Sequence, residues 1–167
     1  IISIALNPLA FHAVKALFRT ASRKPRLAQI FNIGDNDLAH LRGDKRSVLK
    51  DLVILVGCGR VGAPLGLNIR GMYDLVVIDS NREVVENLRQ NQFHAIAGDG
   101  GQEDVLKEAA IEKAVAIVIT VPDPFEAGRI VQAARQLKPD IRILVRAHNG
   151  EEAESFTRQG ADLVLDG

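Results

Sequence analysis

The sequence contains a single cysteine, Cys58, among its 167 residues. One cysteine cannot form a disulfide within the chain or build a cysteine-rich zinc site, and such sparse use fits a reducing compartment. The chain also lacks a charge excess, because 21 Lys and Arg balance 21 Asp and Glu. A dedicated nucleic-acid-binding protein would normally be basic, so nucleic acid is not an expected partner. The 47% of apolar residues instead indicates a folded soluble protein.

Residues of the kind that carry catalysis are sparse and scattered. None of the four histidines stands at metal-ligand spacing from another histidine or from the cysteine; they are His12, His40, His94 and His148. No G-x-S-x-G nucleophile motif is present. We therefore expect no catalytic residues and no metal site, and we predict that the chain is not an enzyme.

The zero net charge is the sum of two unlike parts. Residues 1–50 hold nine basic and three acidic side chains, whereas residues 51–167 hold twelve and eighteen. Within the basic part, residues 1–18 are mostly apolar but fall short of the roughly 20 residues of a membrane span. We expect them to be the end of a truncated membrane helix; a core helix or partner-packing helix is the alternative. Residues 19–50 are expected to form a basic linker, and its first cations are typical of a helix leaving the membrane on the cytoplasmic side: Arg19, Arg23, Lys24 and Arg26.

From Asp51 onward, short β-branched runs alternate with stretches of helical period. The first run is DLVILVG, and the others are Asp74–Ile78, Phe93–Ala97, Val115–Ile119, Ile141–Val145 and Asp162–Leu165. Residues 81–90 and 124–138 show helical patterns, the second ending before Pro139. Six strands alternating with five helices predict an α/β fold over residues 51–167. We expect a doubly wound, Rossmann-like parallel sheet in the order 3-2-1-4-5-6, preceded by an N-terminal helical arm.

The loop after the first predicted strand reads GCGRVG. A G-x-G-x-x-G motif alone is weak evidence, but this one follows a strand, opens a helix and precedes an acidic strand end. Gly57 would permit the tight turn, Gly59 would let a phosphate approach the backbone, and Gly62 would let the helix pack against the strand. Arg60 is expected at the first helical position, where it could contact the phosphate; a solvated arginine is the alternative. Together with Val61, these residues form the predicted phosphate loop.

Further candidate residues follow the second and third predicted strands. Asp79 can accept hydrogen bonds from both ribose hydroxyls and would repel a 2′-phosphate; a helix-capping role is the alternative. Ser80 lies next to it, and Arg82 could stack on adenine or be a surface residue. The GDGG segment supplies Gly98, Asp99 and Gly100 near the adenine end, although a turn and helix cap explain it equally well. These residues predict a site for an adenine nucleotide.

GCGRVG, Asp79 and GDGGQEDVLKEAAI together resemble the N-terminal nucleotide-binding half of the RCK/TrkA-N family. ITVPDPFEAGRIVQAAR, ILVRAH and QGADLVLDG are similar to the cytoplasmic domain of Kef/YbaL-type monovalent cation:proton antiporters. SIALNPL at residues 3–9 is similar to the segment that ends the membrane domain of those proteins. No glutathione-binding set can be matched, so control by glutathione is not expected.

The resemblance implies a regulatory domain that binds AMP or NAD(H) and gates a potassium or other cation:proton antiporter. It further implies a homodimer through this domain, tethered to the membrane antiporter domain of the same parent chain at the cytoplasmic face of a prokaryotic inner membrane. The alternatives are the regulatory RCK domain of a potassium channel or uptake system, and a fragment of an NAD-dependent oxidoreductase.

Overall fold

A computed structural model describes residues 51–166 of the chain. The strands are β1 (Leu52–Val56), β2 (Asp74–Asp79), β3 (His94–Ala97), β4 (Ala114–Ile119), β5 (Arg142–Ala147) and β6 (Leu163–Asp166). The helices are α3 (Gly62–Arg70), α4 (Arg82–Gln90), α5 (Glu103–Glu108), α6 (Pro124–Leu137) and α7 (Gly150–Arg158), and a 3-10 turn, η3 (Ile111–Lys113), precedes β4. Each predicted strand, and each of the helices predicted at 81–90 and 124–138, begins and ends within two residues of the observed bounds.

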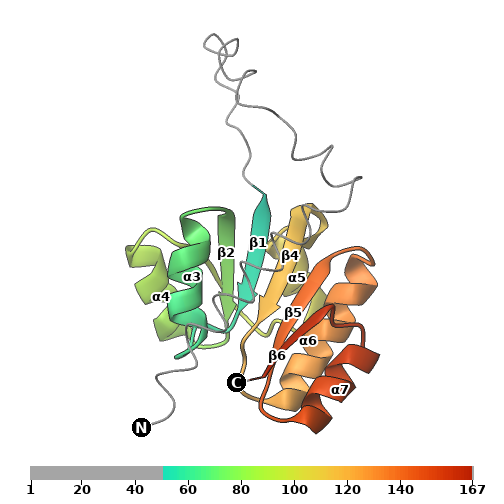
Figure 1. Cartoon of the computed structure of the whole chain (residues 1–167). Coiled ribbons are helices and arrows are strands. Elements are labelled where there is room, and N and C mark those ends of the chain that lie inside the picture. Colours follow the sequence, from blue (N-terminus) through green and yellow to red (C-terminus); the bar gives the residue numbers. More distant parts are fainter. Residues whose placement is uncertain (1–50, 167) are drawn as a thin grey trace, which may run out of the picture. The chain divides into compact units, whose positions relative to one another are not determined.

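All six strands pair in parallel, in the order β3-β2-β1-β4-β5-β6 (Figure 1). This confirms the predicted doubly wound sheet. Four of the five residues of β1 are buried, as expected for an apolar strand covered on both faces of a parallel sheet.

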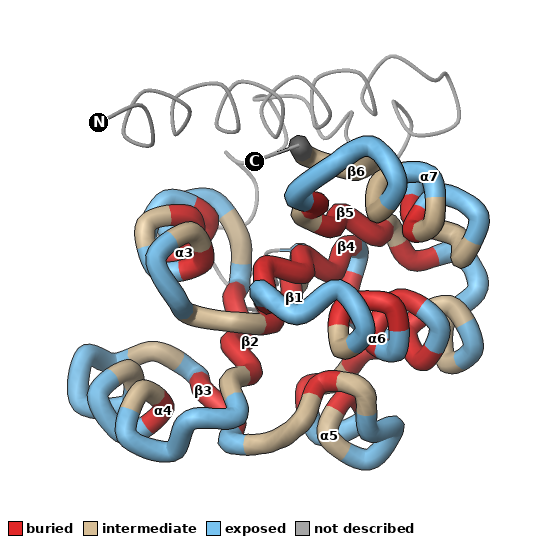
Figure 2. The backbone as a smooth tube through the Cα atoms, turned by 90° about the horizontal axis from the view of Figure 1, so that it is seen from below, coloured by how far each residue is buried: buried red, intermediate tan, exposed pale blue. Residues whose placement is uncertain are grey.

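The helices form two layers on opposite faces of the sheet. Figure 2 shows α3 and α4 on one face and α5, α6 and α7 on the other. The change of face coincides with the point where β1 lies next to β4, so α3 and α6 diverge from neighbouring strands. In open α/β sheets, ligands bind in the crevice at such a point, outside the carboxyl ends of the strands.

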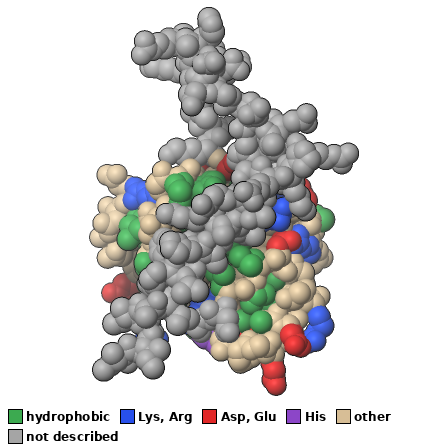
Figure 3. Space-filling view, in the orientation of Figure 1, with side chains coloured by type: hydrophobic (Ala, Val, Ile, Leu, Met, Phe, Trp, Pro, Cys, Tyr) green, Lys and Arg blue, Asp and Glu red, His purple; other side chains and the backbone are tan. Residues whose placement is uncertain are grey.

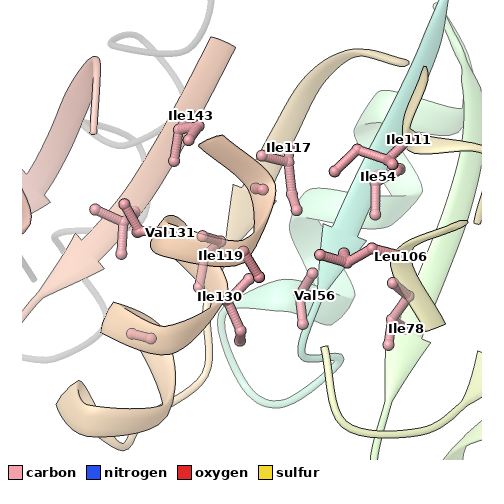
Figure 4. Packing of buried hydrophobic residues seen from close by; sticks show 14 of the residues in the cluster. Ile54, Val56, Ile78, Leu106, Ile111, Ile117, Ile119, Ile130, Val131 and Ile143 are labelled. Carbon is pink, nitrogen blue, oxygen red and sulfur yellow. The ribbon is translucent and has the colours of Figure 1, made fainter. Parts of the chain in front are cut away.

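The main core lies between the sheet and the layer of α5 and α6. Ile54, Ile117 and Ile130 meet there with no exposed surface, and Leu106 of α5 closes the same cluster (Figure 4). Complete burial of an aliphatic side chain of this size contributes about 1.5–3 kcal/mol. The core therefore fixes the sheet and the first turn of α6 relative to each other, which determines the geometry at the carboxyl edge.

Local sequence explains where α4 and α6 begin and end. Asn81 caps α4 by accepting from the amides of Glu83 and Val84, and Val85 is the buried residue of that helix. Asp123 caps α6 in the same way, and Pro124 occupies its first turn, where a missing N–H costs little. The helix ends at Leu137, close before Pro139, as predicted.

The predicted N-terminal arm, comprising the membrane-helix end at 1–18 and the linker at 19–50, lies outside the described residues. Among residues 51–166, none of the helices combines the length and the apolar character that crossing a membrane would require. On the face drawn in Figure 3, acidic and basic side chains of the described part lie interspersed.

Candidate functional site: a glycine loop at the carboxyl edge of the sheet

The loop after β1 turns tightly, and glycine is required at two of its positions, by a positive φ at Gly57 and by a lack of space at Gly62. Gly57 has a φ of +92°, and its amide donates to the carbonyl of Ile78 at 2.9 Å. A Cβ at Gly62 would collide with the carbonyl oxygen of Gly57 and lie 2.7 Å from Thr120 Oγ1. The close packing predicted for Gly62 is therefore with Gly57, at the start of its own loop, and with Thr120, at the end of β4, rather than with the middle of β1.

The middle of the loop faces open space. Gly59 is exposed, and a Cβ built on it would meet no atom within 4 Å. The exposed backbone at Gly59 leaves room for a ligand to reach the loop. The predicted contact between Gly59 and a phosphate remains a prediction, as do the ligand contacts of the other candidate residues.

Helix α3 starts without a side-chain cap. Val61, at its N-cap position, makes no side-chain capping bond, and the first turn holds no acidic residue. Each of the other four described α-helices has a side-chain cap, acidic residues in its first turn, or both. The positive end of the helix dipole at α3 therefore faces no capping side chain and no carboxylate of its own first turn, which favours an anion there.

Arg60 lies in the turn before α3. The prediction that it occupies the first helical position is wrong. The amide of Ala63 donates to the carbonyl of Gly59 at 2.9 Å, so a helical turn starts at the loop. Pro64 has no N–H to give the carbonyl of Arg60, and the regular helix begins only at Gly62. The Arg60 side chain is exposed beside the helix start.

Asp79 joins the glycine loop to the turn after β2. Its Oδ2 accepts from the amide of Cys58 at 2.7 Å, and its Oδ1 accepts from the amide of Asn81 at 2.9 Å. Because Asn81 caps α4, the capping role considered for Asp79 is wrong. Each carboxylate oxygen can still accept a further hydrogen bond, so Asp79 can receive ribose hydroxyls while holding the loop. Ser80 and Arg82 are both exposed next to it.

The GDGG segment packs beside the same loop. The amide of Gly98 donates to the carbonyl of Asp79 at 3.0 Å, and a Cβ on Gly100 would lie 2.6 Å from Val56 Cγ1 at the end of β1. Asp99 Oδ1 accepts from the amide of Gly101 at 2.8 Å, which forms the expected turn. The structure thus brings the ends of β1, β2 and β3 together, and the eleven candidate residues lie at these strand ends, in the turns that follow them, or, for Gly62 and Arg82, at the first residue of α3 and α4.

Asp99 also forms an ion pair that was not predicted. Its Oδ2 lies 2.9 Å from Arg129 Nη2, which links the turn after β3 to α6. Burial raises the pKa of Asp99, but the Gly101 amide and the Arg129 guanidinium outweigh it, so the pKa lies below its ordinary value. Spacing gives no indication of this pair, since its members are 30 residues apart on different elements.

Thr120 is a second residue that sequence reasoning missed. It is the buried polar residue of the described chain, and its Oγ1 lies 2.7 Å from the carbonyl oxygen of Gly57 and 3.2 Å from that of Val56. A polar residue directly after an apolar strand is the one signal that could have found it. Through Thr120, the end of β4 holds the start of the glycine loop.

Two further groups near the carboxyl edge of the sheet have a raised pKa. Burial and the charge of Asp79 raise the pKa of the Cys58 thiol, which makes the reactive thiolate less available. Burial, followed by the charge of Asp99, raises the pKa of Glu126 in the first turn of α6. Within residues 51–166, no three His, Cys, Asp or Glu side chains converge in a way that could hold a metal ion.

A free helix N-terminus beside a fixed carboxylate can hold a phosphate and a ribose at the same time. Residues 53–166 match the TrkA-N domain model. The chain belongs to the TrkA-N domain family. The resemblance to Kef/YbaL-type antiporters is confirmed as well: over 171 residues, the chain is 33% identical to "Putative cation/proton antiporter YbaL" of Escherichia coli, matching 100% of this chain and 29% of that protein.

Two other relatives are transport proteins by name. The chain is 29% identical to a "Glutathione-regulated potassium-efflux system protein" of Haemophilus influenzae, over 99% of this chain and 25% of the relative. It is 32% identical to "Probable potassium channel protein 2" of Methanocaldococcus jannaschii, over 73% of this chain and 37% of the relative. The chain therefore spans well under half the length of these relatives.

Solved structures show the same fold. The TrkA-N domain of the inner membrane protein YbaL from Escherichia coli matches with a TM-score of 0.68 and 37% identity, over 72% of this TrkA-N chain and 90% of that one. The Kef C-terminal domain of Shewanella denitrificans in its AMP-bound form has a TM-score of 0.61 and 26% identity, over 70% of this chain and 71% of the other. The GsuK channel bound to NAD has a TM-score of 0.61 and 27% identity, over 70% of this chain and 21% of the GsuK chain.

Proposed function

We propose that this TrkA-N domain binds an adenine nucleotide, AMP or NAD(H), and thereby regulates a potassium or other monovalent cation:proton antiporter. The uncapped start of α3 beside Asp79 is the observation that carries the proposal. In this arrangement the phosphate binds the free N–H groups of the loop and helix, and the ribose hydroxyls donate to Asp79. Two of the similar solved structures support this ligand class: the Kef domain is bound to AMP, and the GsuK channel is bound to NAD.

The antiporter assignment rests on how much of the chain aligns. The match to the YbaL antiporter covers 100% of the chain, whereas the match to the potassium channel protein covers 73%. The part outside the TrkA-N domain therefore has a counterpart in the antiporter relative. A channel or uptake-system domain is the second candidate, supported by that channel relative and by the GsuK channel.

Regulation follows if nucleotide binding changes how two copies of the domain pack together. In this proposal the domain dimerises at the cytoplasmic face of the inner membrane, and the change in packing reaches the membrane domain of the same parent chain. A ligand can shift such an equilibrium only as far as it binds the two states with different affinity. Sedimentation of the chain with and without nucleotide measures that difference directly, and an unchanged association constant would contradict this route.

The proposal includes no catalysis. In this proposal the site binds the nucleotide, and its carboxylates have structural partners: Asp79 accepts from the amides of Cys58 and Asn81, and Asp99 pairs with Arg129. The purified chain is therefore expected to bind NADH without oxidising it in the presence of small aldehydes or ketones. Loss of the 340 nm absorbance of NADH under these conditions would favour the oxidoreductase alternative.

Calorimetric titration of AMP and NADH tests the site. Gly59→Asp adds a carboxylate where the structure has open space, so it should keep the fold while its charge repels the phosphate and abolishes binding. Gly150→Asp is a matched control, because a Cβ at Gly150, at the start of α7, also meets no atom within 4 Å. Asp79→Ala should weaken binding without abolishing it. Unchanged affinity in both Gly59→Asp and Asp79→Ala would refute this site.

A further inference from the structure

The first turns of α3 and α6 follow neighbouring strands at the carboxyl edge of the sheet. β1 and β4 are neighbours in the sheet, and the two helices leave them toward opposite faces (Figure 2). Thr120, at the end of β4, touches the carbonyl oxygen of Gly57 at 2.7 Å. The segment that leads into α6 is therefore held against the glycine loop, and a ligand that extends beyond that loop toward β4 meets the first turn of α6.

The two helix starts offer opposite electrostatic environments. At α6, Asp123 Oδ1 already accepts from the amide of Glu126 at 2.7 Å, and Pro124 has no N–H to offer. Two carboxylates, Asp123 and Glu126, thus occupy the place where an anion would bind. At α3 the corresponding turn has no cap and no acidic residue.

Glu126 contributes its charge to the crevice itself. Arg129, one turn further along α6, pairs with Asp99 at 2.9 Å, so the partly buried Glu126 lies on a helix turn that is held beside the turn after β3. Burial and the charges of Asp99, Asp123 and Asp79 raise the pKa of Glu126, while Arg129 acts in the opposite direction. Arg129 is itself paired with Asp99, so Asp123 and an ionised Glu126 leave a net negative charge at the start of α6.

The direction of a bound nucleotide follows from the fixed groups. If Asp79 holds the ribose on the β2 side, the first phosphate lies at the start of α3 and any further phosphates run toward β4 and α6. ADP and ATP add one and two negative charges to that path. A dinucleotide instead keeps both phosphates near the loop and presents the neutral hydroxyls of its second ribose, which can donate to a carboxylate.

We infer that the first turn of α6, with Glu126 as its central residue, is a specificity element that admits AMP and the dinucleotide and disfavours nucleotides with additional phosphates. The inference rests on the proposed nucleotide site and names the class of ligand that this site selects. Glu126 is a specificity-determining residue here, acting through its charge on the terminal phosphates and not through contact with the adenosine.

Calorimetric titration of AMP, ADP and ATP in EDTA, which removes bridging divalent cations, tests this role. Affinity should fall from AMP to ATP in the unmodified chain. Glu126→Gln should raise the affinity for ATP roughly threefold or more, because one repulsive charge facing the phosphates is removed, and should change that for AMP less. Glu154→Gln on α7 removes the same charge from an exposed position and should leave all three affinities unchanged.

Equal affinity for AMP and ATP in the unmodified chain would overturn the inference. It would also be overturned if Glu126→Gln raised the affinity for all three nucleotides by the same factor. In both cases AMP still binds, and the proposed function stands. Absence of AMP binding would overturn the proposed function together with the inference, so the two failures are distinguishable.

Discussion

The two halves of the sheet are built alike, but the start of α3 in one half differs from the starts of α6 and α7 in the other. In the half that contains β1, a glycine loop leaves the N-terminus of α3 uncapped. In the half that contains β4, the helices α6 and α7 are both capped, by Asp123 and Asn149, and carry acidic residues in their first turns. The capped starts stabilise the fold without a ligand, whereas the start of α3 has neither a side-chain cap nor an acidic residue. The proposed function assigns the binding site to the start of α3 and the structural support to the half that contains β4.

The largest expected effect comes from filling the closest approach in the β1 half. Gly62→Val places side-chain atoms against the carbonyl oxygen of Gly57 and the Thr120 hydroxyl, and the loop cannot move without breaking its contact with β4. Such overpacking should lower the free energy of unfolding by about 3 kcal/mol. Urea denaturation measures this loss. Gly150→Val, at an open position, should lower stability far less; equal losses would mean that the loop tolerates expansion.

A smaller but clear loss is expected from the structural support in the β4 half. Arg135 donates to the carbonyl oxygens of Pro139, Ile141 and Gly160, and it pairs with Asp162 at 2.9 Å. Arg135→Met should lower the free energy of unfolding by about 2 kcal/mol, because several hydrogen bonds to a partly exposed charge are lost at once.

The affinity for nucleotide should stay unchanged in Arg135→Met. This result would separate the structural role of the half that contains β4 from the binding role proposed for the start of α3. The matched control is Arg158→Met, since the pair between Arg158 and Glu154 is highly exposed and 3.9 Å long. That variant should change stability very little. A weaker affinity for AMP in Arg135→Met at temperatures where it is folded would contradict the division.

The smallest expected effect concerns the ion pair that links the halves. In Arg129→Met, Asp99 loses a group that lowers its pKa, and Glu126 loses the positive charge of Arg129, which opposes the rise of its pKa, so the pKa of each should rise. The depressed pKa of Asp99 stabilises the fold above the pKa of an unfolded Asp, and this contribution disappears as the pH falls through the folded pKa. Carboxyl NMR titration of the variant and of Arg158→Met measures the shifts. An unchanged pKa for Asp99 would contradict the pairing.

Most of the fold could be predicted from sequence because its signals are local. A buried β-branched run such as VAIVI and a proline after a helical pattern each constrain their own segment. The order of strands then follows from the handedness of parallel crossovers. The glycine loop and Asp79 were also within reach, because twenty residues of regular βαβ structure fix their separation.

The rest of the site depends on contacts between distant segments. Thr120 and Gly57 are 63 residues apart in the sequence, and Arg129 and Asp99 are 30 apart. No local sequence pattern therefore predicts either contact. The position of Arg60 was wrong for a local reason: the missing N–H of Pro64 shifts the start of the regular helix by two residues. The capping role considered for Asp79 failed because Asn81, two residues later, is better placed to accept from the amides of α4.

The most direct test of the central claim is a titration of the chain with AMP followed by amide NMR. If the phosphate binds at the uncapped helix start, the amide signals of residues 59–62 should shift strongly, and those of residues 125–127 at the start of α6 much less. Shifts that are larger at the start of α6, or that leave residues 59–62 unaffected, would contradict the claim that the uncapped N-terminus of α3 is the nucleotide site.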